Sequence, residues 1–460
     1  MPITRRDFLR QTGCVLGGAA LASTIDSFGL LDAYAQSGAT DYRALVCIFL
    51  SGGNDGNNMV VPLDAEFAAY NSVRGPSGLA HTQASLLPVS PLSGRQFGFH
   101  PNMSGMQNLF NQGKLAVVPN VGPLVEPLTR ASYQGSGKKP LQLFSHSDQV
   151  NEWQTSLANS ASQTGWGGRT ADRTASLNGT ATFPQMISIA GISTFVIGTN
   201  ARPLAISDSR TSLSAVLPLS DAPGATASET STRRTAMDRL RGFDNELTLI
   251  KAASDTTSSA LQTRDVLISA PAQNFANIPD TTLGWQLEQV ARLIALRDSL
   301  GMKRQIFFCQ LGGFDSHANQ RTNGSQDGLL QQVSQAMSAF YDVTIQLGVA
   351  SNVTTFTLSD FGRTFQPSGS GAAVGSDHGW GNHQMVMGGA VRGQSFYGAF
   401  PTLALGGPDD TDNRGRWIPS TSVEQYSATL ATWYGLSSAD LSYVFPLIGR
   451  FSTPNLGFMF

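Results

Sequence analysis

Acidic and histidine side chains follow three apolar runs that have the composition of buried strands. The runs are Ala44–Leu50, Gln305–Gln310 and Val353–Leu358. The residues that stand just after them are Asp55, Asp315, His317, Asp360 and Arg363. In open α/β sheets, ligands bind beyond the carboxyl ends of the strands. We therefore expect these side chains to converge on one pocket, with glycines providing the tight turns at the sheet edge.

A fourth loop, SDHGWGNH, adds Asp377, His378 and His383. Three of the six histidines of the chain therefore lie in these loops, close to aspartates. Ligands of this kind, without cysteine, suit Zn, Mn, Mg or Fe in hydrolytic centres. We expect a centre of two divalent ions, with ligands drawn from Asp55, Asp315, His317, Asp360, Asp377, His378 and His383. The alternative is that the aspartates serve the turns in which they stand.

A nucleophile is expected at Ser145, where the sequence SHSDQVNEWQT predicts the start of a helix. A helix N-terminus favours anions, so a phosphate or sulfate group would be stabilised there. Ser145 followed by Asp148 also fits a capping box, which is the structural alternative. Ser147 and Thr129 are competing nucleophiles. Arg363 is expected to bind an anionic group of the substrate.

Strand patterns alternate with helical patterns along the chain, which predicts an α/β fold with a mostly parallel sheet and helices on both faces. We expect one domain over 36–460, with a polar helical insertion around 226–300. The Gly/Ser-rich stretch 368–383 reads as a loop. Cys47 and Cys309 lie in apolar runs and are expected to be buried thiols.

The N-terminal segment is typical of an exported protein. TRRDFLR is a twin-arginine pattern, and an apolar run and the sequence Ala33-Tyr34-Ala35 follow it. We expect residues 1–35 to be a signal peptide read by the twin-arginine export machinery, and the mature protein to be periplasmic or secreted. The net charge of −2 gives no basic field for nucleic acid. No apolar stretch beyond this segment is long enough for a transmembrane anchor.

Several motifs together resemble a family of exported bacterial proteins, domain-of-unknown-function family 1501. They are LSGGNDGNNMVVP, FHPNM, SHSDQVNEWQT, GWGGR, GGFDSH, SDFGRT, DHGWGNH and RWIPSTSVEQYSATLATWYGL. The resemblance implies the fold of the alkaline phosphatase and sulfatase superfamily, a three-layer α/β/α sandwich with two metals at the carboxyl edge of the sheet. It also implies that Asp55, Asp315, His317, Asp360 and His378 bind metal and that Ser145 is the nucleophile.

These features favour an exported metal-dependent hydrolase of phosphate or sulfate esters, acting on a small-molecule or glycan substrate. The alternative is a non-catalytic exported protein that keeps the fold and binds an anionic glycan or a partner in the cell envelope. Two departures from the superfamily pattern favour the alternative. Asp360 is followed by Phe361 rather than by histidine, and the sulfatase signature Cys/Ser-x-Pro-x-Arg is absent.

Overall fold

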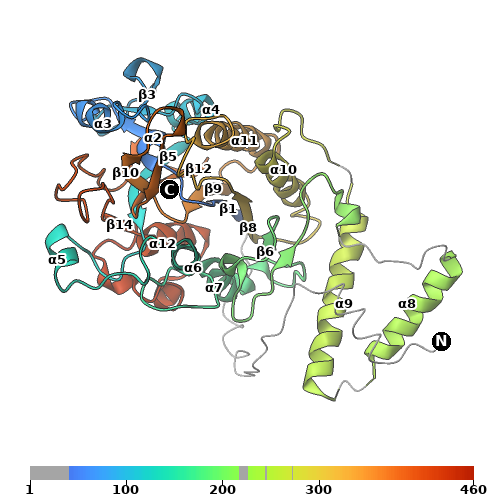
Figure 1. The fold of residues 1–460 in the computed structure, drawn as a ribbon. Coiled ribbons are helices and arrows are strands. Elements are labelled where there is room, and N and C mark those ends of the chain that lie inside the picture. Colours follow the sequence, from blue (N-terminus) through green and yellow to red (C-terminus); the bar gives the residue numbers. More distant parts are fainter. Residues whose placement is uncertain (1–40, 217–225, 244–245, 272) are drawn as a thin grey trace.

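The protein is represented by a computed structural model, which describes residues 41–216, 226–243, 246–271 and 273–460. The expected signal peptide, 1–35, lies outside these residues. Within them, no helix is both long and apolar enough to cross a membrane. The chain folds around a large sheet with helices on both sides (Figure 1).

The central sheet has nine strands among the described residues, in the order β13-β5-β12-β9-β1-β8-β6-β7, with β14 beside β5. Every neighbouring pair is parallel except those of β12, which runs antiparallel to β5 and β9. The strands are β1 (Arg43–Leu50), β5 (Leu115–Gly122), β6 (Met186–Ser188), β7 (Leu204–Ala205), β8 (Arg304–Leu311), β9 (Val353–Ser359), β12 (Asn382–Gly388), β13 (Ser395–Phe396) and β14 (Thr421–Ser422). The mostly parallel sheet confirms the expected fold class.

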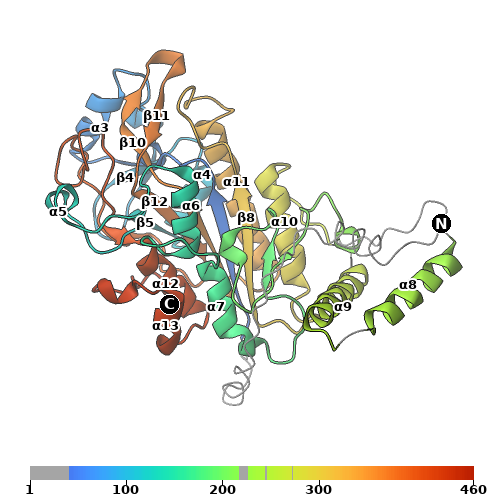
Figure 2. The same ribbon diagram turned by 60° about the horizontal axis from the view of Figure 1, so that its bottom comes forward.

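Two apolar layers cover the two faces of the sheet, because successive side chains of a strand point to opposite faces. Along β1, Val46 and Ile48 belong to one buried cluster, and Cys47 and Phe49 belong to the other. Helices α4 (Ser104–Asn111), α10 (Thr282–Ala295) and α11 (Gln326–Gln346) pack on the first face, and α6 (His146–Thr155), α7 (Trp166–Thr174) and α12 (Val423–Tyr434) lie on the second (Figures 1 and 2).

Cys47 and Cys309 are free, buried thiols in opposite layers, as expected.

The stretch 368–383 differs from the expected loop. Residues Gly375–His378 form strand β11, which pairs antiparallel with β10 (Arg363–Ser368), and β12 begins at Asn382. Val374 and Trp380 are buried, so this glycine-rich segment is anchored at both ends of β11. The glycines conceal the strand in the sequence, but the pairing places Asp377 and His378 at a fixed position beside Arg363.

The predicted helical insertion contains two different parts. Helices α8 (Ala227–Arg241) and α9 (Thr248–Ile268) project away from the sheet, and α8 has no buried residue (Figures 1 and 2). In contrast, α10 packs its apolar stripe, including Leu287 and Val290, into the core. Elements outside the large sheet include α2 (Gly56–Met59), α3 (Phe67–Arg74), α5 (Arg130–Gln134) and the small sheet of β2 (Val60–Pro62), β3 (Leu87–Val89) and β4 (Phe97–Phe99).

The glycine after β1 is required by close backbone packing. Gly52 has φ +116°, and a Cβ atom there would lie 2.3 Å from the backbone nitrogen of Asp315. The backbone of Phe314 also donates to Ser51 O at 3.1 Å. The exits of β1 and β8 are therefore in direct backbone contact, and a side chain larger than hydrogen at position 52 would separate them.

We predict that Gly52→Ala lowers the free energy of unfolding by at least about 2 kcal/mol, because it adds a backbone clash to backbone strain. Gly113→Ala is the matched control, since Gly113 has φ +70° but a Cβ atom there would meet nothing within 4 Å. It should cost about 1 kcal/mol. Equal losses in urea-induced unfolding would show that the contact between the two strand exits contributes nothing.

Candidate functional site

Three histidines and one aspartate converge beyond the carboxyl ends of the central strands. His146 is the first residue of α6, Asp315 and His317 follow β8, and His378 ends β11. The Nε2 atom of His378 lies 3.1 Å from His146 Nε2 and 2.9 Å from His317 Nε2. Asp315 Oδ1 lies 3.5 Å, 3.1 Å and 3.6 Å from the Nε2 atoms of His146, His317 and His378.

The other ring nitrogen of each histidine faces an acceptor. His146 Nδ1 is 2.7 Å from Asp360 Oδ2, and His317 Nδ1 is 3.0 Å from Asp377 Oδ1. His378 Nδ1 is 2.7 Å from the carbonyl oxygen of Phe144. Since a carboxylate or a carbonyl oxygen can only accept, each Nδ1 carries the hydrogen and donates it.

This assignment fixes the character of the centre. A neutral imidazole with hydrogen on Nδ1 has a bare lone pair on Nε2. The lone pairs of His146 and His317 therefore each face that of His378, and all three lie near the Asp315 carboxylate. Electron pairs 2.9–3.1 Å apart repel unless a proton or a metal ion lies between them. The arrangement has the form of a metal centre in which outer acceptors orient the histidine ligands.

The surrounding charges hold the carboxylates ionised. Burial alone would raise the pKa of Asp315, but Arg363, together with His317 and His146, outweighs this and lowers that pKa. Arg363 Nη1 donates to Asp315 Oδ1 at 2.9 Å. Burial would also raise the pKa of Asp377, but His317 and Arg414 outweigh it and lower that pKa. The hydrogen bond to Asp360 raises the pKa of His146, whereas burial lowers that of His378.

The donor set fits a divalent ion. Imidazole nitrogens and a carboxylate are typical ligands of Zn, and also suit Mn or Fe. Ligands around a tetrahedral zinc ion are separated by about 3.3 Å, as follows from a Zn–N distance of about 2.0–2.1 Å. The five separations above, 2.9–3.6 Å, lie around this value. The side chain of Asp315 is 49% exposed and that of His146 is 34% exposed, so the centre is open to solvent on one side.

Asp55 is not part of this cluster. Its two carboxylate oxygens accept from Arg74 at 2.6 and 3.1 Å and from Gln320 Nε2 at 2.5 Å. Asp55 and Arg74 are both completely buried. Sequence reasoning placed Asp55 at the correct strand exit, but a guanidinium from α3 occupies the carboxylate. Removing Asp55 would leave Arg74 buried and unpaired, at a cost of about 3–5 kcal/mol in folding.

His383 and Arg363 also have roles different from those expected. His383 is buried, its Nδ1 accepts from the backbone of Asn120 at 3.1 Å, and its ring stacks on Phe400. Burial lowers the pKa of His383 to about 3, so it is a neutral core residue. Arg363 is 1% exposed, and its guanidinium donates to Asp315 and to the carbonyls of Gly52 and Ser376. It is buried against Asp315 rather than exposed to solvent.

Asp360 and Asp377 lie behind the histidines. Asp360 Oδ1 accepts from Gly52 N at 3.0 Å while its other oxygen accepts from His146. Asp377 links His317 to Arg414. Of the seven expected ligands, the structure therefore brings Asp315, His317 and His378 into the centre and places Asp360 and Asp377 as their supports.

Ser145 is the N-cap residue of α6 by position, but the expected capping box is absent. Its hydroxyl donates to Asp148 Oδ2 at 2.6 Å and makes no hydrogen bond to the helix backbone. The short Asp148 side chain, three residues on, accepts the hydrogen bond from this hydroxyl instead. Thr129, a competing nucleophile, forms a reciprocal capping box with Ser132 at the start of α5. Ser147 lies 3.2 Å from both Ser145 Oγ and Asp148 Oδ2.

His146 is the ligand that sequence reasoning missed. It stands beside Ser145 as the first residue of α6, and it is not preceded by Gly-Gly or by an aspartate. The available signal was a histidine at the first position of a helix beyond a strand of the central sheet. In the folded chain, contacts with Asp360 and His378 bring the start of α6 to the other three.

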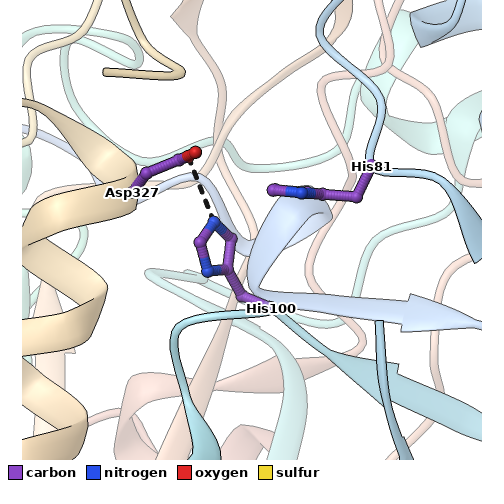
Figure 3. Close-up of side chains that lie close together, drawn as sticks. All are labelled: His81, His100 and Asp327. Carbon is purple, nitrogen blue, oxygen red and sulfur yellow. Dashed lines mark hydrogen bonds and ion pairs between the residues drawn. The ribbon is translucent and has the colours of Figure 1, made fainter. Parts of the chain in front are cut away.

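A second group, His81, His100 and Asp327, also offers three ligand atoms near one another, and Figure 3 shows the side chains pointing toward a common space. However, His100 Nδ1 accepts from Asn102 N at 3.1 Å, so His100 Nε2 carries the hydrogen and donates to Asp327 at 3.1 Å (Figure 3). His100 therefore offers no lone pair to an ion. Arg321 Nε also lies 3.3 Å from Asp327, so hydrogen bonding accounts for two of the three members, His100 and Asp327.

We predict that His378→Gln weakens zinc binding by at least about 100-fold, because losing a ligand costs more than losing an outer partner. His100→Gln is the matched control and should bind zinc within a few-fold of the unmodified protein. Titration with zinc against a competing chelator measures both constants. The reverse pattern, in which His100→Gln loses zinc and His378→Gln keeps it, would place the ion in the second group.

Comparisons with known proteins give one family and several remote folds. No sequence among the curated proteins matches this chain. Similar solved structures include the PsFucS1 sulfatase from Pseudoalteromonas sp. (10% identity, 79% of this chain and 66% of that chain, TM-score 0.31). They also include the lipoteichoic acid synthase LtaP from Listeria monocytogenes (8%, 90% and 80%, 0.31). A third is the C-terminal periplasmic domain of EcEptC from Escherichia coli in complex with Zn (10%, 87% and 84%, 0.31).

These likenesses are distant, and the chemistry assigned to the centre rests on its own side chains. The family described as "Protein of unknown function (DUF1501)" matches residues 42–414. The expected membership is confirmed: the chain belongs to the DUF1501 family.

Proposed function

We propose that the protein is a metal-dependent hydrolase of phosphate or sulfate esters. The observation that carries this proposal is the convergence of three Nε2 lone pairs, each fixed by an acceptor at Nδ1, on one solvent-open carboxylate. A core histidine cluster would not need to be open to solvent, and a hydrogen-bonded cluster would not direct acceptors at one another.

In this proposal His146, Asp315 and His378 hold the ion, and His317 completes the set. These residues offer ligand atoms close to one another, and His317 contacts two of them. An ion bound there would act as a Lewis acid on the ester oxygen. Asp360 and Asp377 keep the imidazoles in the required tautomer. The geometry supports one ion at this centre, since Arg74 takes the place of a cation at Asp55.

Ser145 is the nucleophile that we propose. It directly precedes the ligand His146, and its hydroxyl already donates to the Asp148 carboxylate, which would accept the proton as Ser145 attacks. The N-terminus of α6 would stabilise the anion held there. Ser147 shares the contact with Asp148 but is more exposed, which makes it the natural comparison.

We predict that zinc- or manganese-loaded protein hydrolyses an aryl phosphate or an aryl sulfate, and that Asp315→Asn lowers kcat/KM by on the order of 10³-fold, since a lost metal interaction costs several kcal/mol in the transition state. Asp298→Asn, at an exposed aspartate, is the control and should retain full activity. Ser145→Ala should be inactive and Ser147→Ala active.

Unchanged turnover in Asp315→Asn would contradict the assignment of the centre. A metal-loaded protein that turns over no ester would favour the alternative, a non-catalytic protein that binds an anionic glycan or a partner in the cell envelope.

We further propose that the protein is exported by the twin-arginine pathway, which the motif at Arg5 and Arg6 supports. Replacing both residues by lysine should leave the full-length precursor inside the cell, because the pair is the feature that the pathway reads. Fractionation of cells, followed by measurement of the N-terminal sequence, tests this. Cleavage after Ala35 in the exported fraction is expected, and undiminished export of the double-lysine variant would contradict the proposal.

A further inference from the structure

His378 is held on two sides by residues from distant parts of the chain. Its Nδ1 donates to Phe144 O at 2.7 Å, and its own carbonyl oxygen accepts from Arg416 Nε at 3.0 Å. Phe144 and Arg416 also contact each other, because the guanidinium carbon lies 4.1 Å from the centre of the phenyl ring. His378, Phe144 and Arg416 therefore each contact the other two.

The backbone of Phe144, whose carbonyl oxygen contacts His378, is strained. Its φ is +72°, a left-handed conformation that is a true outlier for a bulky side chain. Such strain persists only where the surroundings impose it, and it is common at functional sites. Here it accompanies the placement of the Phe144 carbonyl against His378, two residues before His146. One loop therefore contributes a ligand and orients another.

Arg416 is fixed independently of Phe144. The buried carboxylate of Asp410 accepts four backbone N–H groups of its loop, those of Gly406, Asp412, Gly415 and Arg416. Arg130 donates to two carbonyls of the same loop, at Gly407 and Asp412. This loop, 406–416, also supplies Arg414 to Asp377. These hydrogen bonds hold the loop in a conformation that places Arg416 beside His378.

We propose that Phe144 and Arg416 form a clamp on His378, in which the Phe144 carbonyl sets the tautomer, Arg416 holds the Phe144 ring and the His378 backbone, and the pair thereby sets the metal affinity of the centre. The inference rests on the proposed function, because it assumes that His378 binds an ion. Both are positioning residues, since neither contributes an atom to the centre itself. If the pair merely stabilised its loops, its removal would lower stability but leave the affinity for the ion unchanged.

The test measures zinc affinity and urea stability of the metal-free protein for Phe144→Leu, Arg416→Gln and the double variant. Each single variant should bind zinc about 10–100-fold more weakly, as for other outer partners of histidine ligands. The double variant should lose less than the sum, since the two residues act on one target. Phe144→Tyr keeps the ring and should retain the zinc affinity of the unmodified protein. Arg392→Gln removes a similar stacking contact, on Phe460, and is the control.

Affinities within twofold of the unmodified protein in both single variants would overturn the clamp, even where stability falls. A second readout separates this failure from failure of the proposed function. Spectra of ¹⁵N-labelled histidine in the metal-free protein report whether His378 carries hydrogen on Nδ1. The clamp predicts that this tautomer is populated in the unmodified protein. Phe144→Leu and Arg416→Gln keep the carbonyl of residue 144 but remove the ring–guanidinium contact that holds it against His378, so the share of this tautomer should fall in both. An unchanged tautomer would refute the clamp whether or not the protein binds zinc.

Discussion

The candidate metal centre depends on one constraint, that three imidazoles present unprotonated Nε2 atoms to one carboxylate oxygen, Asp315 Oδ1. Acceptors behind the rings impose this: the carboxylates of Asp360 and Asp377 and the carbonyl of Phe144. Without an ion, the lone pairs repel, or one ring takes up a proton and donates to its neighbour. The folded protein holds this unfavourable arrangement through hydrogen bonds outside the centre. A bound ion would remove the repulsion between the lone pairs. The free energy that orients the three imidazoles is therefore supplied by folding rather than by metal binding.

The fold supplies the supports from one edge of a mostly parallel sheet. The exits of β1, β8 and β9 lie side by side, and Gly52 lets the first two approach until their backbones touch. Asp360, at the third exit, bonds to Gly52 N and to His146, so one carboxylate joins the sheet edge to α6. The buried pair of Asp55 and Arg74 joins the turn after β1 to the end of α3. It also places a fixed positive charge where a second cation would otherwise be attracted.

The sequence predicted the sheet and much of the site because both follow from local patterns. Apolar runs identified β1, β8 and β9, and the rule that loops meet at the carboxyl edge led to Asp315, His317 and His378. The errors have tertiary causes. The sequence around Asp55 does not reveal that Arg74, nineteen residues on, fills its carboxylate. His383 lies in β12 with its side chain buried, and His146 meets the other ligands only in the folded chain. Strand β11 was hidden by its glycines, although its pairing with β10 fixes His378.

The most direct test of the central claim is anomalous diffraction at the zinc absorption edge from crystals of the zinc-loaded protein. The account predicts one strong peak within bonding distance of His146 Nε2, His378 Nε2 and a carboxylate oxygen of Asp315, with Asp360 and Asp377 still bonded to the histidines. A peak among His81, His100 and Asp327, or the lack of any peak at the histidine centre in protein that has been saturated with zinc, would contradict it.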